Sequence, residues 1–433
     1  MRIYTYPSKD ARRRVQQLAA RDLGFKKKDV LAVTRILEDV RKNGDAAVIR
    51  YARKFDAPKI TTKRLPATDA EIKAAGKQVD RAFVRSLNKA IGQIETFHRQ
   101  QLPKSWMDTS RDGTLLGQMV HPVDAAGVYV PGAKGGTTPL VSSVLMGAIP
   151  ARIAGVGKIV MTTPSRKDGS LDPHLLVAAK RVGIDAVYKI GSAWAIGALA
   201  YGTRTIPKAD VIVGPGNLFV TLAKKIVAGT VGIDMIAGPS EILIIADQTA
   251  DPEHLAADML SQAEHDVLAS SVLLTTSKEV ARATARQVDL QLARLSRQAI
   301  ARASIKQFGT IVVVPNIQTA IDIANDFAPE HLELIVEEPF NLLSSLKNAG
   351  AIFVGPYTPE PVGDYIAGPN HVLPTAGTAR FSSALSVETF IKKTSLIHYS
   401  RDAFQKDAGD IIRLAEIEGL DAHANAIKVR QKK

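Results

Sequence analysis

The sequence contains no cysteine among its 433 residues. This absence excludes disulfide bonds, thiolate-ligated zinc, iron–sulfur clusters and a cysteine nucleophile. No apolar run reaches the roughly 18 residues of a membrane-spanning helix, and the first residues lack the apolar stretch of a secretory signal. We therefore expect a cytoplasmic protein without a membrane partner, whose chemistry depends on nitrogen and oxygen side chains.

Aromatic residues are scarce, at 5%, and acidic residues are outnumbered by basic ones, which gives a formal net charge of +13. A basic excess can indicate nucleic acid or an anionic ligand. Here the excess lies largely in residues 10–29 and in the tail "KVRQKK", which are typical of solvated helix faces and carry few aromatics for base stacking. We expect no nucleic-acid partner, and keep a basic, noncatalytic nucleic-acid-binding protein as the alternative from another class.

Short apolar segments rich in β-branched residues alternate with helix-like stretches after a helical region at 29–100. The first set lies at 126–132, 158–164, 186–191 and 210–216, and the second at 241–247, 270–277, 309–315, 332–338 and 350–356. This alternation predicts βαβ units with buried parallel sheets. We expect an α/β fold of two doubly wound, incomplete Rossmann-like domains with helical N- and C-terminal segments, and no sheet signal after about residue 385.

Glycine-containing loops follow the first set of strands, at 129–139, 189–197 and 213–219. Ligands of open α/β sheets bind beyond the carboxyl ends of the strands, and glycine lets backbone amides approach a phosphate. No G-x-G-x-x-G follows the first strand, so the usual dinucleotide fingerprint is absent. These loops suit either a nucleotide site or tight turns.

Four stretches carry histidine, carboxylate or amide side chains. In "LSQAEHD" (260–266), Gln262 and His265 end a helix that Asp251 is predicted to cap, and their spacing places them on one face. In "FAPEHLEL" (327–334), adjacent Glu330 and His331 could share general-base work. Two further pairs lie in "VGDYIAGPNHVLPT" (362–375), with Asp364 and His371, and in "EGLDAHA" (418–424), with Glu418 and His423. Each stretch alone also fits a solvated helix end or a charged turn, but together they suit a metal site with N/O ligands.

Six motifs in order resemble those of the histidinol dehydrogenase family over nearly the whole chain: "VGPGN", "GTVGIDMIAGPSEILIIAD", "LSQAEHD", "APEHLEL", "GDYIAGPNHVLPT" and "EGLDAHA". The resemblance implies an NAD-dependent, zinc-requiring enzyme that oxidises L-histidinol through the aldehyde to L-histidine with two NAD⁺. These are the last two steps of histidine biosynthesis. A paralogue that oxidises another small polyol or amino alcohol is the alternative among enzymes, and retention of Glu418 and His423 favours histidinol.

The resemblance also implies one zinc ion per subunit, held by Gln262, His265, Asp364 and His423. It places substrate contacts on Ser240, His331, Glu418 and the zinc ligands, with His371 as an addition. The family is a homodimer whose C-terminal tail reaches the partner's active site. Glu418 and His423 would therefore act in the neighbouring subunit.

Oxidation of the aldehyde requires added water here, because the chain has no cysteine to form a thiohemiacetal. The resemblance assigns water activation to Glu330 and proton transfer to His331. For NAD it implies Tyr129, Trp194 and Asn217. Trp194 stands where the family commonly has glutamine, so this ring could stack on the cofactor or pack in the core.

The expected domain bounds combine the strand pattern with the resemblance. We assign 1–25 to an N-terminal helical segment, and 26–125 with 239–385 to a first, discontinuous α/β domain. Residues 126–238 are expected to form a second α/β domain on the NAD side, and 386–433 a C-terminal helical dimerisation tail.

Overall fold

A computed structural model of the chain describes residues 1–21, 24–132 and 138–431. They form two compact units, of which the first comprises Met1–Gln101 with Val123–Phe390 and the second Leu102–Pro122 with Ile391–Lys433. Residues 133–137 of the glycine-containing loop at 129–139 lie outside the described residues. Across the described parts of the chain, the helices lack the combined length and hydropathy that crossing a bilayer requires.

The first unit contains a six-stranded parallel sheet with the strand order β1-β12-β11-β10-β13-β14. Its strands are β1 (Ile3–Thr5), β10 (Glu241–Ala246), β11 (Ser270–Thr275), β12 (Thr310–Val313), β13 (His331–Ile335) and β14 (Ala351–Val354). The associated helices are α1 (Lys9–Ala19), α11 (Pro252–Ala263), α12 (Lys278–Leu292), α13 (Gln298–Phe308), α14 (Ile317–Phe327) and the short α15 (Glu360–Tyr365).

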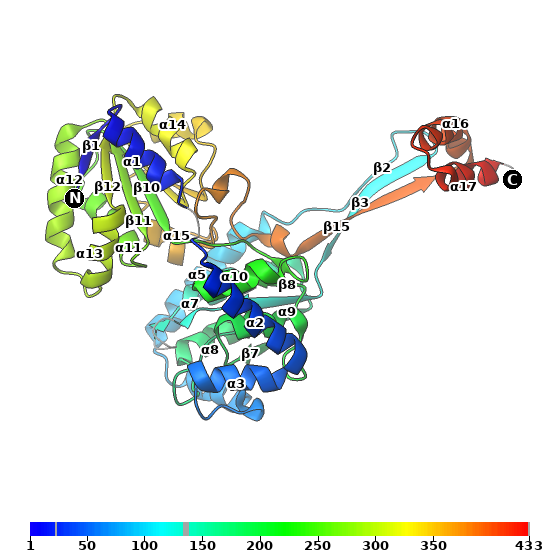
Figure 1. Cartoon of the computed structure of the whole chain (residues 1–433), viewed down its shortest axis with the longest axis horizontal. Coiled ribbons are helices and arrows are strands. Elements are labelled where there is room, and N and C mark those ends of the chain that lie inside the picture. The colour runs from blue at the N-terminus through cyan, green and yellow to red at the C-terminus, as the bar shows by residue number, and fades with distance from the viewer. Residues whose placement is uncertain (22–23, 133–137, 432–433) are drawn as a thin grey trace. The chain divides into compact units, whose positions relative to one another are not determined.

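Helices cover both faces of this sheet, because β10 is apolar on both sides. Ile242 and Ile244 pack with side chains of α11, α12 and α13, whereas Leu243 and Ile245 pack with those of α1 and α14. Figure 1 shows α12 and α13 on one side of the sheet and α1 and α14 on the other. The expected doubly wound arrangement is confirmed for this sheet.

A five-stranded parallel sheet, also in the first unit, has the order β7-β6-β4-β8-β9. Its strands are β4 (Ala125–Tyr129), β6 (Lys158–Thr162), β7 (Ala186–Tyr188), β8 (Val211–Val213) and β9 (Gly232–Ile233). Its helices are α2 (Lys27–Asn43), α3 (Asp45–Phe55), α4 (Asp69–Gly76), α5 (Arg81–Arg99), α7 (Val141–Ala154), α8 (Pro173–Arg181), α9 (Ser192–Tyr201) and α10 (Leu218–Val227). Short elements complete the unit: β5 (Thr138–Pro139), η1 (Thr62–Arg64), η2 (Pro339–Ser345), η3 (Thr378–Arg380) and η4 (Val387–Phe390).

Close helix–strand approach on both faces of β4 depends on two glycines. A Cβ on Gly127 would lie 3.0 Å from a methyl of Leu199 in α9. On the opposite face, a Cβ on Gly147 in α7 would lie 2.5 Å from a methyl of Val128. Helices thus pack closely on both faces of β4. Both sheets are parallel and covered by helices, as the sequence predicted.

The second unit is an antiparallel sheet joined to two helices. The sheet has the order β15-β3-β2, and its strands are β2 (Trp106–Asp108), β3 (Thr114–Pro122) and β15 (Ile391–Tyr399). The helices are α16 (Arg401–Ile417) and α17 (Asp421–Gln431), with Gly419 in a left-handed conformation between them. Gly419 therefore ends α16, since its left-handed backbone cannot continue the helix.

Three expectations about chain organisation require correction. The segment 1–25 is not only helical, because β1 pairs with β12. The segment 26–125 does not join 239–385: Leu37 and Val48, in α2 and α3, lie in one core with Ile196 of α9 and Ile212 of β8. The tail 386–433 contains β15, so sheet structure continues beyond residue 385. β15 has mostly exposed side chains, which explains why it lacks an apolar strand signal.

Candidate active site

Gln262 lies in the last turn of α11, and His265 follows three residues later in different surroundings. As predicted, Asp251 caps the helix through a hydrogen bond from the amide of Glu253 at 2.8 Å, and Pro252 occupies the first turn. The Gln262 side chain is completely buried. His265 follows the helix, and its side chain is 47% exposed. Gln262 thus faces the interior while His265 reaches solvent.

Neither amide atom of Gln262 has a hydrogen-bond partner among the described residues. An unpaired polar group in the interior costs about 1–3 kcal/mol, so such groups in native proteins commonly serve a ligand. An amide oxygen is an acceptable, if weak, metal ligand. The buried amide therefore fits the role of a side chain that is satisfied only when the site is filled.

His265, Glu360 and Asp364 form a group that could hold a metal ion, because each offers a ligand atom within 4.8 Å of the others. Glu360 and Asp364 are one turn apart in α15, and a carboxylate oxygen of Glu360 lies 3.9 Å from Nε2 of His265. Burial raises the pKa of Asp364, and the neighbouring His371 imidazole opposes this effect. A bound cation would favour the ionised carboxylates.

Glu330 and His331 are both buried and are held by the main chain of the same residue. Oε2 of Glu330 accepts the amide N–H of Glu241 at 2.9 Å. Nδ1 of His331 donates to the carbonyl oxygen of Glu241 at 3.0 Å, which leaves Nε2 without a proton in the neutral ring. Burial lowers the pKa of His331 to about 4 and raises that of Glu330 well above its usual range. The His331 ring is therefore neutral near pH 7, and its unprotonated Nε2 lies 4.0 Å from a carboxylate oxygen of Glu360.

A cleft of about 1020 Å³ in the first unit gathers several of the predicted residues. Ser240, His265, Glu330, His371 and Asn217 all line it. Nδ1 of His371 lies 3.6 Å from Asp364, too far for a direct hydrogen bond. The cleft is large enough for a small-molecule substrate and part of a cofactor.

The three residues predicted to contact NAD differ in their surroundings. Asn217 caps α10 by accepting the amides of Phe219 and Val220, and it opens on the cleft. Tyr129 is buried, and its hydroxyl accepts the amide of Ser192 at 3.1 Å. Neither Tyr129 nor Trp194 lines the cleft.

Core packing accounts for the position of Trp194. The ring is 4% exposed and stacks on Tyr51 and Phe55, with centroid distances of 5.9 and 5.4 Å. The Trp194 ring thus packs against aromatic side chains of α3.

Glu418 and His423 belong to the second unit. Glu418 caps the C-terminus of α16 and His423 lies in α17, and both are exposed. Neither belongs to the group formed by His265, Glu360 and Asp364.

Comparison with known proteins identifies the family. The family model described as histidinol dehydrogenase matches residues 22–431. The chain belongs to the histidinol dehydrogenase family.

Relatives and a solved structure agree with this membership. The histidinol dehydrogenase of Desulfotalea psychrophila is 59% identical over 401 residues, which cover 93% of this chain and 92% of the relative. That of Clostridium acetobutylicum is 50% identical and covers 100% of this chain and 99% of its own length. The crystal structure of histidinol dehydrogenase from Elizabethkingia anophelis superposes with a TM-score of 0.93 at 38% identity, covering 100% of this chain and 98% of that one.

Sequence reasoning missed three buried carboxyl groups beside the predicted residues of this histidinol dehydrogenase family member. They are Glu360 in α15, Glu333 in β13 and Asp258 in α11, and each is less than a tenth exposed. Glu333 lies two residues after the catalytic candidate His331 and on the same face of an apolar strand, which is a signal that could have identified it. Glu360 and Asp364 at i and i+4 look like an exposed helix pair in sequence, so nothing there marked Glu360 as buried.

Proposed function

We propose that this chain oxidises L-histidinol through L-histidinaldehyde to L-histidine with two NAD⁺, the last two steps of histidine biosynthesis. The observation that carries the proposal is the buried Glu330–His331 pair beside the group of His265, Glu360 and Asp364, in a member of this family. A base and a metal-binding group in one region suit removal of protons from an alcohol and from an aldehyde hydrate.

One zinc ion per subunit is expected at Gln262, His265, Asp364 and His423. The buried, unpaired amide of Gln262 and the proximity of His265 to Asp364 support this assignment, and a chain without cysteine can offer only N/O ligands. When bound, zinc would supply positive charge that orients the substrate's amine and imidazole. Ser240, His371 and Glu418 are the further side chains proposed to contact the substrate.

In the first oxidation, His331 takes the hydroxyl proton at Nε2 as the carbinol hydride leaves to NAD⁺, which yields the aldehyde, NADH and one proton. In the second, Glu330 removes a proton from water as its oxygen attacks the aldehyde carbon. The resulting hydrate anion then loses its remaining hydroxyl proton to His331 and a hydride to a second NAD⁺, which yields the carboxylate. Burial strengthens the Glu330 carboxylate as a base because it raises its pKa.

NAD⁺ is the proposed hydride acceptor, and Asn217 is the cofactor contact that the geometry supports best. The Asn217 carbonyl is used to cap α10, which leaves its amide nitrogen able to donate to a ligand in the cleft. Tyr129 does not line the cleft and would act indirectly, because its hydroxyl accepts the amide of Ser192 at the start of α9.

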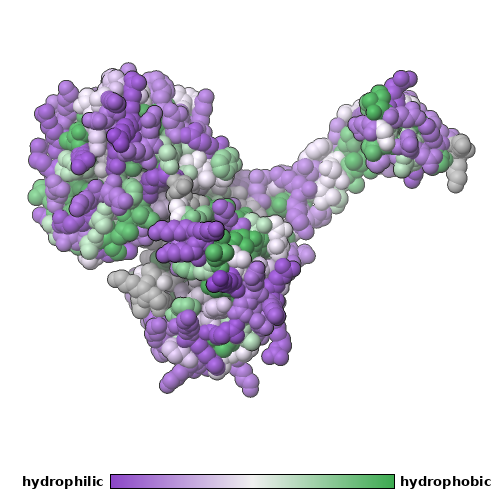
Figure 2. All heavy atoms as spheres, viewed as in Figure 1, coloured by the Kyte–Doolittle hydropathy of each residue, from purple (hydrophilic) through white to green (hydrophobic). Residues whose placement is uncertain are grey.

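A homodimer with a shared active site is proposed to bring Glu418 and His423 of one subunit to the cleft of the other. The second unit exposes large apolar side chains on its strands and helices, among them Trp106, Met107, Ile397, Leu414 and Ile417. Figure 2 shows hydrophobic surface among hydrophilic side chains on the part of the chain that carries α16 and α17. Burial of such side chains against a second copy would lower their free energy.

The decisive experiment measures NADH formation from L-histidinol, with and without a zinc chelator. We expect two NADH per histidinol and loss of turnover on chelation, with recovery on zinc addition. Turnover of other amino alcohols without any turnover of histidinol would assign the chain to a paralogue instead. Chelator-insensitive turnover would remove zinc from the proposal.

A further inference from the structure

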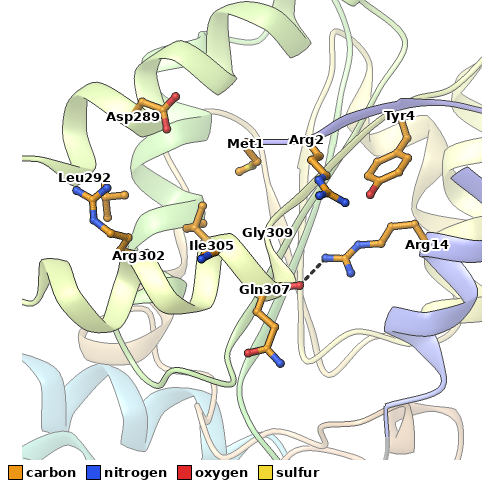
Figure 3. A pocket seen from close by; sticks show the side chains of 11 residues that line it. Met1, Arg2, Tyr4, Arg14, Asp289, Leu292, Arg302, Ile305, Gln307 and Gly309 are labelled. Carbon is orange, nitrogen blue, oxygen red and sulfur yellow. Dashed lines mark hydrogen bonds between the residues drawn. The ribbon is translucent and has the colours of Figure 1, made fainter. Parts of the chain in front are cut away.

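A second cavity, of about 610 Å³, lies at the edge of the six-stranded sheet (Figure 3). It is formed by β1, the helix α1, and the facing helices α12 and α13, and no residue assigned above to substrate, zinc or NAD lines it. Its volume is in the range of small-molecule sites. A ligand of this cavity would therefore bind independently of the proposed function.

Positive charge dominates the lining of this cavity. Arg2, Arg14, Arg302 and Lys306 all contribute, against a single acid, Asp289. Within the described parts of the chain, none of the four cations forms an ion pair with a carboxylate. Like charges around one concavity repel each other and focus a positive potential into it, which an anion would relieve.

Arg14 is the preorganised member of this set. Its Nε donates to the hydroxyl of Thr310 at 2.9 Å and its Nη2 to the carbonyl of Gln307 at 2.8 Å, the bond drawn in Figure 3. Burial lowers the pKa of Arg14, and the nearby charge of Arg2 adds to this effect. The two bonds fix the guanidinium plane and leave Nη1 to donate to a ligand, at little further cost in side-chain entropy.

The same cavity has an apolar part. Leu292 and Ile305, from α12 and α13, are buried, and Met1 lines the cavity with them. Tyr4 lies beside Arg2 and Arg14 in Figure 3. A single carboxylate would compensate only a quarter of the cationic charge, whereas a phosphate group brings about two charges and suits the arginine fork.

We propose that this cavity binds a phosphorylated small molecule, with the phosphate between Arg2, Arg14 and the cations of α13, and its less polar part against Leu292 and Ile305. The cavity belongs to the six-stranded sheet alone, so binding requires no residue of the candidate active site.

Calorimetric titration of the zinc-loaded, full-length protein with pyrophosphate, and separately with inorganic phosphate, tests the proposal. We expect saturable binding, tighter for pyrophosphate, that Arg14→Gln and Arg302→Gln each weaken about tenfold, the loss typical of one charge-assisted contact. Arg302 is exposed, so Arg302→Gln keeps the test valid if Arg14→Gln impairs folding. Turnover should remain unchanged in Arg302→Gln.

The chain offers a matched control in another basic concavity, of about 480 Å³, which is lined by Lys73, Lys180 and Arg181. Lys180→Gln and Arg181→Gln should leave pyrophosphate affinity within about twofold, because they change net charge equally without touching the proposed cavity. Equal weakening by control and test variants would show nonspecific charge attraction and overturn the proposal. Affinity that neither Arg14→Gln nor Arg302→Gln changes, or the absence of saturable binding, would overturn it as well.

Discussion

The main-chain amide of Glu360 donates a hydrogen bond to Oε1 of Glu333 at 3.0 Å. Burial, and after it the neighbouring charge of Asp258, raises the pKa of Glu333 well above its usual range. Asp258 lies in α11 one turn before Gln262, and Glu333 follows His331 in β13. These contacts join the three elements that carry the first unit's proposed zinc ligands and bases.

Replacement of Glu333 is expected to weaken zinc binding although Glu333 is not a proposed ligand. Glu333→Leu removes the acceptor for the Glu360 amide, so α15 loses its anchor and zinc affinity should fall about 10- to 100-fold. Glu333→Gln keeps an acceptor for that amide and should retain most of the affinity. Zinc affinity is measured by competition with a chromogenic chelator. Equal losses of zinc affinity in Glu333→Leu and Glu333→Gln would contradict a hydrogen-bonding role for Glu333. Both replacements fill the same space, so a purely steric role would give equal losses.

Gln262→Leu should separate metal binding from folding stability. The wild-type amide makes no hydrogen bond, so its replacement by an apolar side chain of similar size is expected to stabilise the metal-free protein by about 1–2 kcal/mol. Zinc affinity should fall in the same variant because one ligand is lost. Urea denaturation of the metal-free protein and chelator competition measure the two effects.

Asn370→Leu is the matched control for Gln262→Leu. This buried amide donates to the carbonyl of Met146 at 2.8 Å and accepts the amide of Val372 at 3.0 Å. Its replacement should therefore destabilise the protein by about 1–3 kcal/mol. Destabilisation of comparable size by Gln262→Leu would show that the Gln262 amide is already satisfied without metal.

Glu330→Gln should affect the two oxidations unequally. The glutamine oxygen can still accept the Glu241 amide, so the fold should be kept, but the side chain cannot activate water. Oxidation of L-histidinaldehyde should slow about 10²- to 10⁴-fold, and oxidation of L-histidinol to the aldehyde much less. Single-turnover NADH formation from each substrate measures the two steps. Equal losses in both would place Glu330 outside the water-activating step.

The sequence predicted the parallel strands well because their apolar character is local. β10 and β11 are buried on both faces, so most of their positions are apolar, and this leaves a nearly continuous apolar pattern. β15 pairs with β3 in a sheet with largely exposed faces, so its sequence carries no such pattern. The helices α2 and α3 show a second limit of sequence-based prediction. Periodicity predicts that the face of α2 that carries Leu37 is buried, but not which sheet this face packs against.

The site was predictable in its motifs but not in the groups that support them. Glu330 and His331 stand out as a pair, whereas the main chain of Glu241 that holds both is separated by about ninety residues and offers no side-chain signal. Likewise, the burial of Glu360 depends on its contact with Glu333 across two elements. Contacts of this kind are set by tertiary packing and cannot be read from spacing.

Glu241 should give the metal-free protein a pH-dependent stability. Burial raises its pKa to about 7, compared with roughly 4.3 in an unfolded chain. Between these values the unfolded chain has lost the proton that the folded protein keeps, so the contribution of Glu241 is most favourable below about pH 4 and is lost as the pH rises towards 7.

Glu241→Gln removes this titration. Urea unfolding at pH 5 and pH 8 should show the variant gaining stability relative to wild type at the higher pH, because the substituted amide keeps an acceptor for the Ala376 N–H without a buried charge. The exposed Glu253→Gln should show no such gain. The prediction would be contradicted if the free energy of unfolding changed equally between pH 5 and pH 8 in the wild type and in Glu241→Gln.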